Sequence, residues 1–405
     1  MTRRILITGG SIAGNTAAWA LAEQGIDVVL LEKAPAFRDG GQNVDVRDVG
    51  REVLQRMGLE AEALANGTGE EGTAWVNEDG SHAATFLAKD IEGDGPTAEL
   101  EILRGDLACL LYAASRDRVD YRFGDTVRVV HDDGRGVTVE FASGRTEVFD
   151  ALIIAEGVGS STREMVFPGE NQPRWMDLTV AYFTIPRSAD DDRLWRWYHA
   201  PGGRSVSLRP DRHGTTRAML TVQGPAKGEH EWSREQQQQY LRDMFADAGW
   251  EAPRVLAAMD ETDDFYFDAL RQVQLPAWHK GRVVITGDAA WCATPVAGIG
   301  TTLAVTGAYV LAGEIGRSDD LEAAFAAYDD AVRPMVEKAQ GIPKIGPRLM
   351  NPHSKLGIHL LHGALKVASS PALQQLAGKL MTQDLKAPDL TRYDTVLPPR
   401  VAPTR

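Results

Sequence analysis

Cysteine, long apolar runs and excess positive charge are all scarce in this sequence. Its 405 residues include two cysteines, Cys109 and Cys292, which stand far apart in the chain. That pattern favours neither a disulfide framework nor a cysteine zinc site. No apolar run reaches the roughly 18 residues of a membrane span. The net charge of −14 disfavours nucleic-acid phosphates and anionic membranes as partners. We therefore expect a cytoplasmic protein that binds neither nucleic acid nor a membrane.

The apolar content of 43% is ordinary for a soluble protein, and the length suggests two or more domains. The chain contains two kinds of predicted strand. Short continuous apolar runs at 5–7 and 28–31 are typical of strands buried on both faces of a parallel sheet, and 151–155 and 282–286 are predicted as two further buried strands. Segments between 178 and 222 instead mix apolar and polar positions, which predicts an antiparallel sheet with one wet or ligand-facing side.

A glycine-rich turn follows the first of the buried strands. It reads Gly9-Gly10-Ser11-Ile12-Ala13-Gly14, with serine at the place of the middle glycine in G-x-G-x-x-G. The second strand ends at Glu32, which is 18 residues after Gly14 and close to the spacing of about 20 expected of an acid that binds a ribose. Strand, turn, helix, strand and acid together predict a dinucleotide site. The alternative is a similar turn without a ligand.

A second constellation begins at the strand near residue 283. The sequence Thr286-Gly287-Asp288 places an aspartate at the carboxyl end of a buried strand, where ligands bind in open α/β sheets. Pro295, Gly298 and Gly300 follow, and a helix is predicted to begin near residue 301. Glycines let the backbone approach a flat ring, and a helix N-terminus stabilises a developing anion. A plain strand-to-helix loop is the alternative interpretation.

These motifs occur together with others in one order. The set comprises Gly9–Gly14 with Glu32, Arg104 in 102–107, Glu156-Gly157 with Ser160 and Arg163, and Gly287-Asp288 with Pro295 and Gly300. In that order the sequence resembles the single-component FAD-dependent aromatic hydroxylases, the p-hydroxybenzoate hydroxylase-like class A flavoprotein monooxygenases. The resemblance extends over roughly residues 4–340. Short family members similar to this chain include tetracycline-inactivating enzymes and polyketide hydroxylases.

The resemblance implies an α/β fold in which a Rossmann-like FAD-binding domain is interrupted by an antiparallel-sheet substrate domain. With the strand pattern, it assigns residues 1–72, 100–174 and 275–345 to the FAD-binding domain. Residues 73–99 and 175–274 are assigned to the substrate domain, and 346–405 to C-terminal helices.

The resemblance also implies a cofactor, FAD, with NADPH or NADH as a transient co-substrate. Glu32 is expected at the adenosine ribose, Arg104 along the pyrophosphate, and Asp288 at a ribityl hydroxyl. The full expected set is Gly9, Ser11, Ile12, Ala13, Gly14, Glu32, Lys33, Gln42, Val44, Asp45, Arg104, Val127, Asp288, Pro295, Gly298, Gly300 and Thr301.

Some positions depart from the family pattern. The aspartate of its Asp-Gly motif is Glu156 here, which leaves the choice between NADH and NADPH open. Trp291 stands where histidine is common, and Thr302 and Thr306 stand where asparagine and aspartate are frequent. None of these changes removes a group that flavin chemistry requires.

The predicted antiparallel sheet provides candidate substrate contacts. Trp195 and Trp197 share one strand face, so they are expected either to stack on a planar substrate or to pack against a neighbouring helix. Arg217 is a third candidate. The family needs no protein nucleophile or metal, and no catalytic residue is predicted. His359 and His362 share a helix face but have no evident third ligand, so no metal site is expected.

The leading hypothesis is an FAD-dependent monooxygenase that uses NAD(P)H and oxygen. In the family, a flavin C4a-hydroperoxide hydroxylates the substrate, here expected to be an aromatic or polycyclic polyketide-like small molecule. A non-oxygenating FAD reductase and a flavin-binding sensor without turnover are the alternatives. We expect a monomer or a homodimer.

Overall fold

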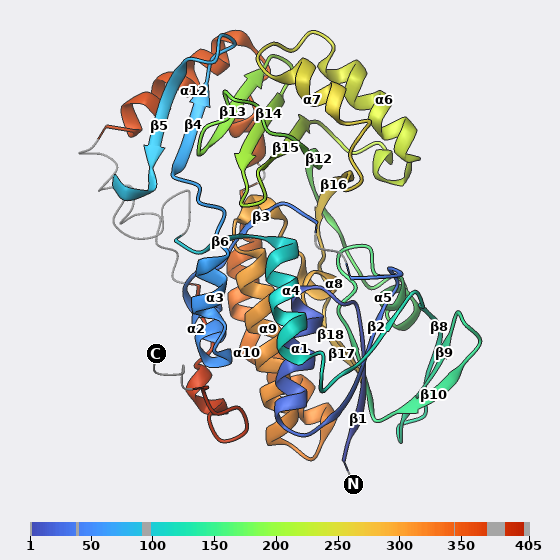
Figure 1. Cartoon of the computed structure of the whole chain (residues 1–405). Helices are drawn as coiled ribbons and strands as arrows, with labels where there is room; N and C mark the ends of the chain where they lie inside the picture. Colours follow the sequence, from blue (N-terminus) through green and yellow to red (C-terminus); the bar gives the residue numbers. More distant parts are fainter. Residues whose placement is uncertain (1, 38–39, 91–98, 344, 371–384, 401–405) are drawn as a thin grey trace.

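The structure is a computed structural model that describes residues 2–37, 40–90, 99–343, 345–370 and 385–400. Figure 1 shows two layers, a parallel sheet with its helices and an antiparallel sheet with its own helices. The predicted mixed α/β fold with C-terminal helices is confirmed.

The parallel sheet has the strand order β17-β18-β11-β1-β2-β7. Its strands are β17 (His279–Lys280), β18 (Val283–Ile285), β11 (Ala151–Ile154), β1 (Arg4–Thr8), β2 (Asp27–Glu32) and β7 (Asp120–Phe123). Only the short β17 pairs antiparallel, among the described residues. The continuous apolar runs predicted here are buried, as strands covered on both faces require.

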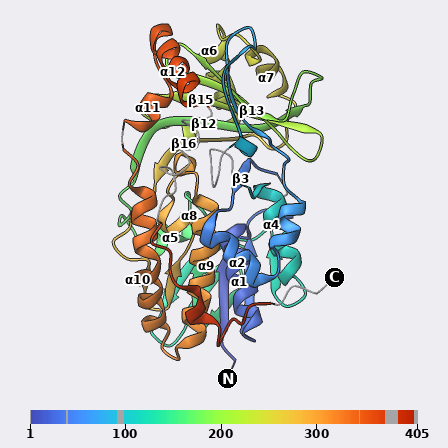
Figure 2. The same cartoon turned by 90° about the vertical axis from the view of Figure 1, so that its left-hand side faces the viewer.

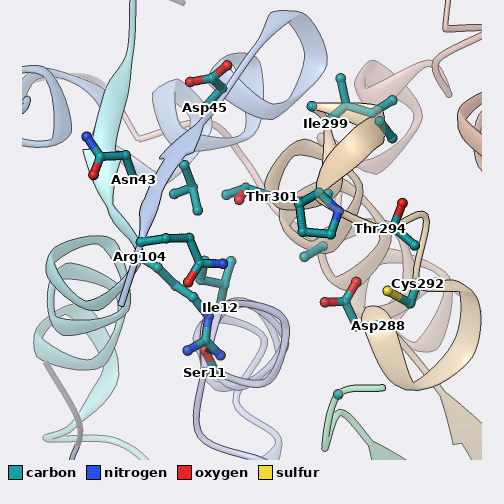
Figure 3. A pocket seen from close by; sticks show the side chains of 18 of the residues that line it. Ser11, Ile12, Asn43, Asp45, Arg104, Asp288, Cys292, Thr294, Ile299 and Thr301 are labelled. Atoms are coloured by element: carbon teal, nitrogen blue, oxygen red, sulfur yellow. Dashed lines mark hydrogen bonds between the residues drawn. The ribbon is translucent and has the colours of Figure 1, made fainter. Parts of the chain in front are cut away.

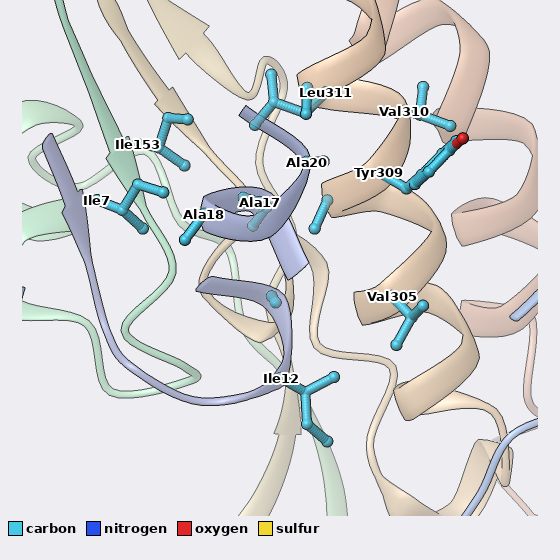
Figure 4. Close-up of a cluster of buried hydrophobic side chains, with 14 of the residues drawn as sticks. Ile7, Ile12, Ala17, Ala18, Ala20, Ile153, Val305, Tyr309, Val310 and Leu311 are labelled. Atoms are coloured by element: carbon cyan, nitrogen blue, oxygen red, sulfur yellow. The ribbon is translucent and has the colours of Figure 1, made fainter. Parts of the chain in front are cut away.

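Helices cover one face of this sheet, and a small antiparallel sheet lies on its other side (Figure 1). The helices are α1 (Ile12–Glu23), α4 (Arg104–Ser115), α9 (Gly300–Arg317) and α10 (Leu321–Gln340), and the small sheet is β8 (Val127–Asp132), β9 (Val137–Phe141) and β10 (Thr146–Phe149). The small side chains of Ala17 and Ala20 let α1 approach α9 closely (Figure 4). Ile7 and Ile153 fill the space behind α1 from the sheet.

The antiparallel sheet has the order β16-β12-β15-β14-β13-β4-β5. Its strands are β16 (Tyr266–Gln272), β12 (Arg174–Pro186), β15 (Thr215–Gln223), β14 (Arg204–Pro210), β13 (Leu194–Ala200), β4 (Gly72–Val76) and β5 (His82–Leu87). Alternation divides each strand between two faces. Ala181, Phe183 and Leu220 pack with Leu241 of α6 (Arg234–Phe245) and Val255 of α7 (Ala252–Ala258) in a second core.

The remaining elements connect and cover these layers. They are β3 (Asn43–Asp45), α2 (Asp48–Met57), α3 (Glu60–Ala65), η1 (Ala88–Asp90), β6 (Glu101–Leu103), α5 (Ser161–Val166), η2 (Glu229–Glu231), α8 (Asp288–Trp291), η3 (Pro295–Ala297), α11 (Gly346–Met350), α12 (Lys355–Ala368) and η4 (Leu390–Tyr393). Figure 2 shows α10, α11 and α12 along one side of the molecule, from the parallel-sheet layer to the antiparallel sheet. No helix in the described ranges is long and apolar enough to span a membrane.

Several elements differ from the sequence-based expectations. Of the C-terminal helices expected over 346–405, residues 346–370 contain α11 and α12 with a break after Met350, and residues 371–384 and 401–405 lie outside the described residues. Residues 385–400 contain the short η4 turn at Leu390–Tyr393, which packs on α9, and no α-helix. The domain division stays a prediction, although β4 and β5 do join the sheet formed by residues 174–272.

Candidate functional site

A cavity of about 1930 Å³ lies between the parallel-sheet layer and the antiparallel sheet. Every residue predicted for the cofactor lines it except Gly14, and the three predicted substrate contacts Trp195, Trp197 and Arg217 line it too. We use two names for its parts. The nucleotide layer is the cavity-lining part of residues 8–13, 31–33, 104–105, 125–127, 155–161 and 288–304. The sheet wall comprises Leu178, Val180, Tyr182, Trp195, Trp197, Ser207, Arg209, Arg217, Ala218, Met219, Thr221 and Leu270.

The glycine-rich turn connects β1 to α1 at the floor of the cavity (Figure 3). Gly9 has φ +100°, and a Cβ there would lie 2.4 Å from the Ala155 carbonyl oxygen. A Cβ on Gly14 would lie only 1.9 Å from the Gly9 carbonyl oxygen. Gly14 therefore does not line the cavity; its role is to let the first turn of α1 pack against the turn before it.

The N-terminus of α1 opens onto the cavity without a side-chain cap. Ser11 occupies the N-cap position but makes no capping hydrogen bond, and the first turn has no acidic residue. Its Oγ instead accepts a hydrogen bond from Arg104 Nη2 at 2.8 Å. The first N–H groups of a helix lack intrahelical partners. The exposed helix end and the Arg104 guanidinium together form an anion site.

Glu32 fixes the turn from the end of β2. Its Oε2 accepts a hydrogen bond from the Gly10 amide at 2.8 Å, and its Oε1 accepts one from the Ala34 amide at 2.9 Å. The carboxylate still lines the cavity. The glycine turn and the acid that follows it are thus one structural unit.

Asp288 stands at the start of α8, after β18. Its side chain is open to the cavity but otherwise enclosed by protein, and this burial raises the pKa of its carboxyl group. The nearby Arg104 guanidinium and a hydrogen bond from the Cys292 thiol oppose that shift (Figure 3). Gly287 has φ +63°, and a Cβ there would lie 2.8 Å from Ala13 Cβ, so the α8 loop and α1 approach closely.

A second helix N-terminus opens onto the same cavity. The helix α9 begins at Gly300, its N-cap Ile299 provides no side-chain hydrogen bond, and its first turn is free of acids. Gly300 and Thr301 line the cavity. Thr302 Oγ1 accepts a hydrogen bond from the Arg47 amide at 2.9 Å, which holds the β3–α2 loop against the start of α9.

Glu156, the departure from the family's Asp-Gly motif, has a structural use here. Its carboxylate accepts hydrogen bonds from Ser160 Oγ at 2.7 Å, from the Thr162 amide at 3.1 Å and from Thr162 Oγ1 at 2.6 Å. These bonds hold the first turn of α5 beside the cavity. Arg163 of α5 donates to the Ala289 carbonyl at 3.1 Å, so this segment also positions the Asp288 loop.

The sheet wall presents aromatic side chains from neighbouring strands. The Trp195 and Trp197 rings lie 4.7 Å apart on the cavity face of β13. Trp195 Nε1 donates a hydrogen bond to Ser207 Oγ at 3.1 Å. Of the two interpretations left open by the sequence, the structure favours the one in which both tryptophans face a ligand cavity.

The arginines of the sheet wall are paired with carboxylates. Arg209 stacks over Trp195 at 3.9 Å from the ring centroid. Its guanidinium contacts Glu70 at 2.8 Å and Glu101 at 2.7 Å. Arg217 also contacts two carboxylates, those of Asp211 and Asp264.

A sequence model of the FAD binding domain family matches residues 2–339. The chain belongs to this family, that of the class A flavoprotein monooxygenases. The FAD-dependent monooxygenase asL4 of Sarocladium schorii is 32% identical over 424 residues, covering 97% of this chain and 99% of that protein. Monooxygenase CTB7 of Cercospora beticola is 36% identical over 394 residues, covering 92% and 94%. The crystal structure of tetracycline destructase Tet(51) is similar with a TM-score of 0.78 and 29% identity, covering 91% of this chain and 97% of that one.

The residues present fit the FAD of this flavoprotein monooxygenase. Two uncapped helix N-termini, at α1 and α9, face one cavity. The first suits a pyrophosphate, and the second suits the negative edge of a reduced flavin. Gly9 and Gly14 leave no space for side chains, so the backbone itself lines the cavity at this turn.

Sequence reasoning missed several lining residues of the flavoprotein. Gly10, Tyr182, Arg209 and Asn351 line the cavity but were not predicted to bind. Gly10 belongs to the glycine motif and was recognisable there. Arg209 and Tyr182 lie on other strands than Trp195, and the register of the sheet brings the three to one face.

Two of the histidines join α12 to the antiparallel sheet. Within the described ranges, no group of three or more His, Cys, Asp or Glu side chains is placed to hold a metal ion. His362 of α12 meets His199 of β13, with 3.4 Å between Nε2 and Nδ1. Burial, with a smaller contribution from His362, lowers the pKa of His199 to about 4. This pair joins α12 to the antiparallel sheet as neutral imidazoles.

Proposed function

We propose that this FAD-dependent monooxygenase uses NADPH or NADH and molecular oxygen to hydroxylate an aromatic or polycyclic polyketide-like small molecule. The observation that supports this most is the shared cavity, which joins a dinucleotide-type layer to an aromatic sheet wall. Its 1930 Å³ exceeds the roughly 300–1,000 Å³ of an ordinary single-ligand pocket. The space therefore suits a dinucleotide and a substrate of several rings together. The likeness to a tetracycline destructase agrees with a polycyclic substrate.

The roles proposed for the nucleotide layer follow from its contacts. The amides of Ile12 and Ala13, with Arg104, would hold the pyrophosphate of FAD. Glu32 holds the turn in shape and presents its carboxylate to the ribose end. Asp288 would accept a hydrogen bond from a ribityl hydroxyl. Pro295, Gly298 and Thr301 would line the flavin ring, with Val127 at the adenine end.

Bound FAD supplies the redox chemistry and the activation of oxygen. The protein's own task is to hold the substrate beside the ring and to keep water away from it. The apolar side chains Leu178, Val180 and Leu270 of the antiparallel sheet line the cavity and exclude water from that side. The N-terminus of α9 places its positive end toward the ring site and stabilises negative charge there.

An isotope experiment tests this proposal. FAD-loaded protein is incubated with NADPH or NADH, isotopically labelled oxygen and a panel of phenols and hydroxylated anthraquinones. We expect at least one compound to stimulate NAD(P)H oxidation and to gain one labelled oxygen atom. Turnover of a substrate without oxygen would instead identify a reductase, and FAD binding without any turnover would identify a sensor.

A further inference from the structure

The charges of the sheet wall bear on which substrate this proposed monooxygenase accepts. The wall contains two arginines, Arg209 and Arg217, within the described residues. In many binding sites such groups receive a substrate carboxylate as a bidentate partner. Whether they can do so here depends on the carboxylates that already contact them.

Arg209 is enclosed between two buried acids. Its side chain is 14% exposed, whereas Glu70 and Glu101 are 0% and 4% exposed. The two carboxylates carry one more negative charge than the single guanidinium neutralises. The Trp195 ring covers one face of Arg209 at 3.9 Å. Arg209 therefore holds the tryptophan in place and offers no unsatisfied positive charge.

Arg217 is enclosed in a similar way. Its Nε lies 3.1 Å from Asp211 Oδ2, and its Nη1 lies 3.0 Å from Asp264 Oδ2. Nη1 also donates to Thr184 Oγ1. The Arg217 side chain is 12% exposed and Asp211 is fully buried. The positive charge predicted to contact the substrate is thus already matched by two carboxylates of the protein.

The strand β3 and the loop after it add no unpaired cation to the cavity. Asp45 of β3 lines the cavity and contacts Arg47 at 2.7 Å, with both side chains 14% exposed. The other cavity-lining cations in the described ranges lie in the nucleotide layer or in segments outside the wall; they are Lys33, Arg51, Lys89 and Arg104. The two guanidiniums of the sheet wall thus contact four carboxylates, and the wall has an excess of negative charge.

The wall also offers uncharged polar groups. Tyr182 lines the cavity, and its hydroxyl has no hydrogen-bond partner among the described residues. Burial raises the pKa of Tyr182 to about 12, so the phenol stays protonated near neutral pH. It can donate a hydrogen bond to a hydroxyl or quinone oxygen without any charge on the ligand.

We propose that the sheet wall selects an uncharged, planar, oxygen-substituted aromatic molecule and rejects the same molecule when it bears a carboxylate. This inference rests on the proposed function for its site but concerns binding alone. A carboxylate placed here would meet two guanidiniums whose charge Glu70, Glu101, Asp211 and Asp264 already neutralise, and an unpaired charge in such a site is costly. Stacking on Trp195 and Trp197 supplies the attraction for a neutral ring system.

The test compares two ligands that differ by one carboxylate. Danthron is a dihydroxyanthraquinone that is uncharged near neutral pH. Rhein has the same ring system with one added carboxylate. Dissociation constants are measured by calorimetry on the FAD-loaded, oxidised protein in the absence of NAD(P)H. We expect danthron to bind at least about tenfold more tightly than rhein, since rhein places an unpaired charge in the wall. Equal or tighter binding of rhein would overturn the proposal, and so would failure of both ligands to bind.

A charge variant sharpens the result. Glu101→Gln removes one of the two negative charges beside Arg209. The glutamine has nearly the same shape, and its Oε1 can still accept the hydrogen bond that Asn43 Nδ2 donates at 2.6 Å. We expect this variant to bind rhein several-fold more tightly relative to danthron. The control is Glu147→Gln, whose acid pairs with Arg4 and Arg122 away from the cavity and whose ligand preference should match the wild type. An unchanged preference in Glu101→Gln would contradict the assignment.

The two proposals fail in different ways. Danthron that binds preferentially but never gains an oxygen atom would contradict the oxygenase reaction and leave the inference standing. Oxygen transfer to a substrate that needs its carboxylate for binding would support the oxygenase and overturn the inference. Should Glu101→Gln fail to fold, the wild-type comparison of danthron with rhein decides alone.

Discussion

The nucleotide layer meets the cavity mainly with backbone, whereas the sheet wall meets it with side chains. In the first, Gly9 and two uncapped helix ends leave amides facing the cavity. In the second, Trp195 is held by Ser207 of the neighbouring strand β14, and Arg209 is held by Glu101 of β6. A backbone surface tolerates few side chains and leaves a compact motif in the sequence. A side-chain surface can be assembled from positions that are separated in the sequence, and it therefore leaves no compact motif.

The comparison separates a mostly buried arginine of the sheet wall, Arg209, from an exposed arginine of the nucleotide layer, Arg104, and this gives the largest predicted effect. Arg209→Met leaves Glu70 and Glu101 without their cation, so the free energy of unfolding should fall by about 3–5 kcal/mol. Arg104 contacts Ser11 and is exposed, so Arg104→Met should change the free energy of unfolding little and weaken FAD binding instead. Urea unfolding and FAD titration of both variants check this. If both lose stability equally, the contrast between the two regions is wrong.

A pair of helical glycines tests the close packing of the nucleotide layer. Gly14→Ala places a Cβ 1.9 Å from the Gly9 carbonyl oxygen, which forces α1 away from the turn. We expect a loss of about 1–3 kcal/mol in unfolding free energy and poor retention of flavin. The control is Gly363→Ala in α12, where a Cβ would meet nothing within 4 Å. That variant should be neutral or slightly stabilised, because alanine favours a helix.

Acid should affect the sheet region through His199. In the unfolded chain its pKa is near the ordinary 6.5, and in the folded protein burial lowers the pKa to about 4. The unfolded state therefore binds a proton first as the pH falls. The stability from the neutral imidazole is fully present above pH 6.5 and declines toward pH 4, by about 2 kcal/mol between pH 7 and pH 5.

Urea unfolding at several pH values measures this decline. The variant His199→Gln should show a shallower dependence than the wild type over the same range. His359→Gln, which changes a histidine outside the His199–His362 contact, is the control and should keep the wild-type slope. Identical slopes in wild type and His199→Gln would contradict the assignment.

The smallest predicted effect concerns the aromatic surface. Trp195→Leu removes a stacking face but keeps an apolar side chain, so the substrate KM should rise by about tenfold with unchanged FAD content. The control is Trp232→Leu. This tryptophan is exposed, packs on Tyr240 of α6 and does not line the cavity. A loss of flavin in Trp195→Leu would show that the wall also holds the dinucleotide, contrary to the division of labour between the two regions.

The contrast also explains what the sequence could and could not predict. The buried strands, the glycine turn with Glu32, and Asp288 after β18 were predicted because each is a local pattern with one structural meaning. The face shared by Trp195 and Trp197 followed from strand alternation. Gly14 was expected at the ligand, but it does not line the cavity, and a Cβ there would lie 1.9 Å from the Gly9 carbonyl oxygen.

The rest depended on contacts that no local pattern encodes. The enclosure of Arg217 by Asp211 and Asp264 requires the register of β12 against β15 and the loop before β16. The pairing of Arg209 with Glu101 joins two segments more than a hundred residues apart. The helix α10 was not predicted as a separate element, although it covers the parallel-sheet layer beside α9.

A crystal structure of the protein with FAD and danthron tests the central claim most directly. The account predicts the pyrophosphate at the N-terminus of α1, the flavin ring beside the start of α9, and danthron against Trp195 and Trp197 with an oxygen near the Tyr182 hydroxyl. A dinucleotide bound along the sheet wall, or an aromatic ligand held at the α1 turn, would contradict it.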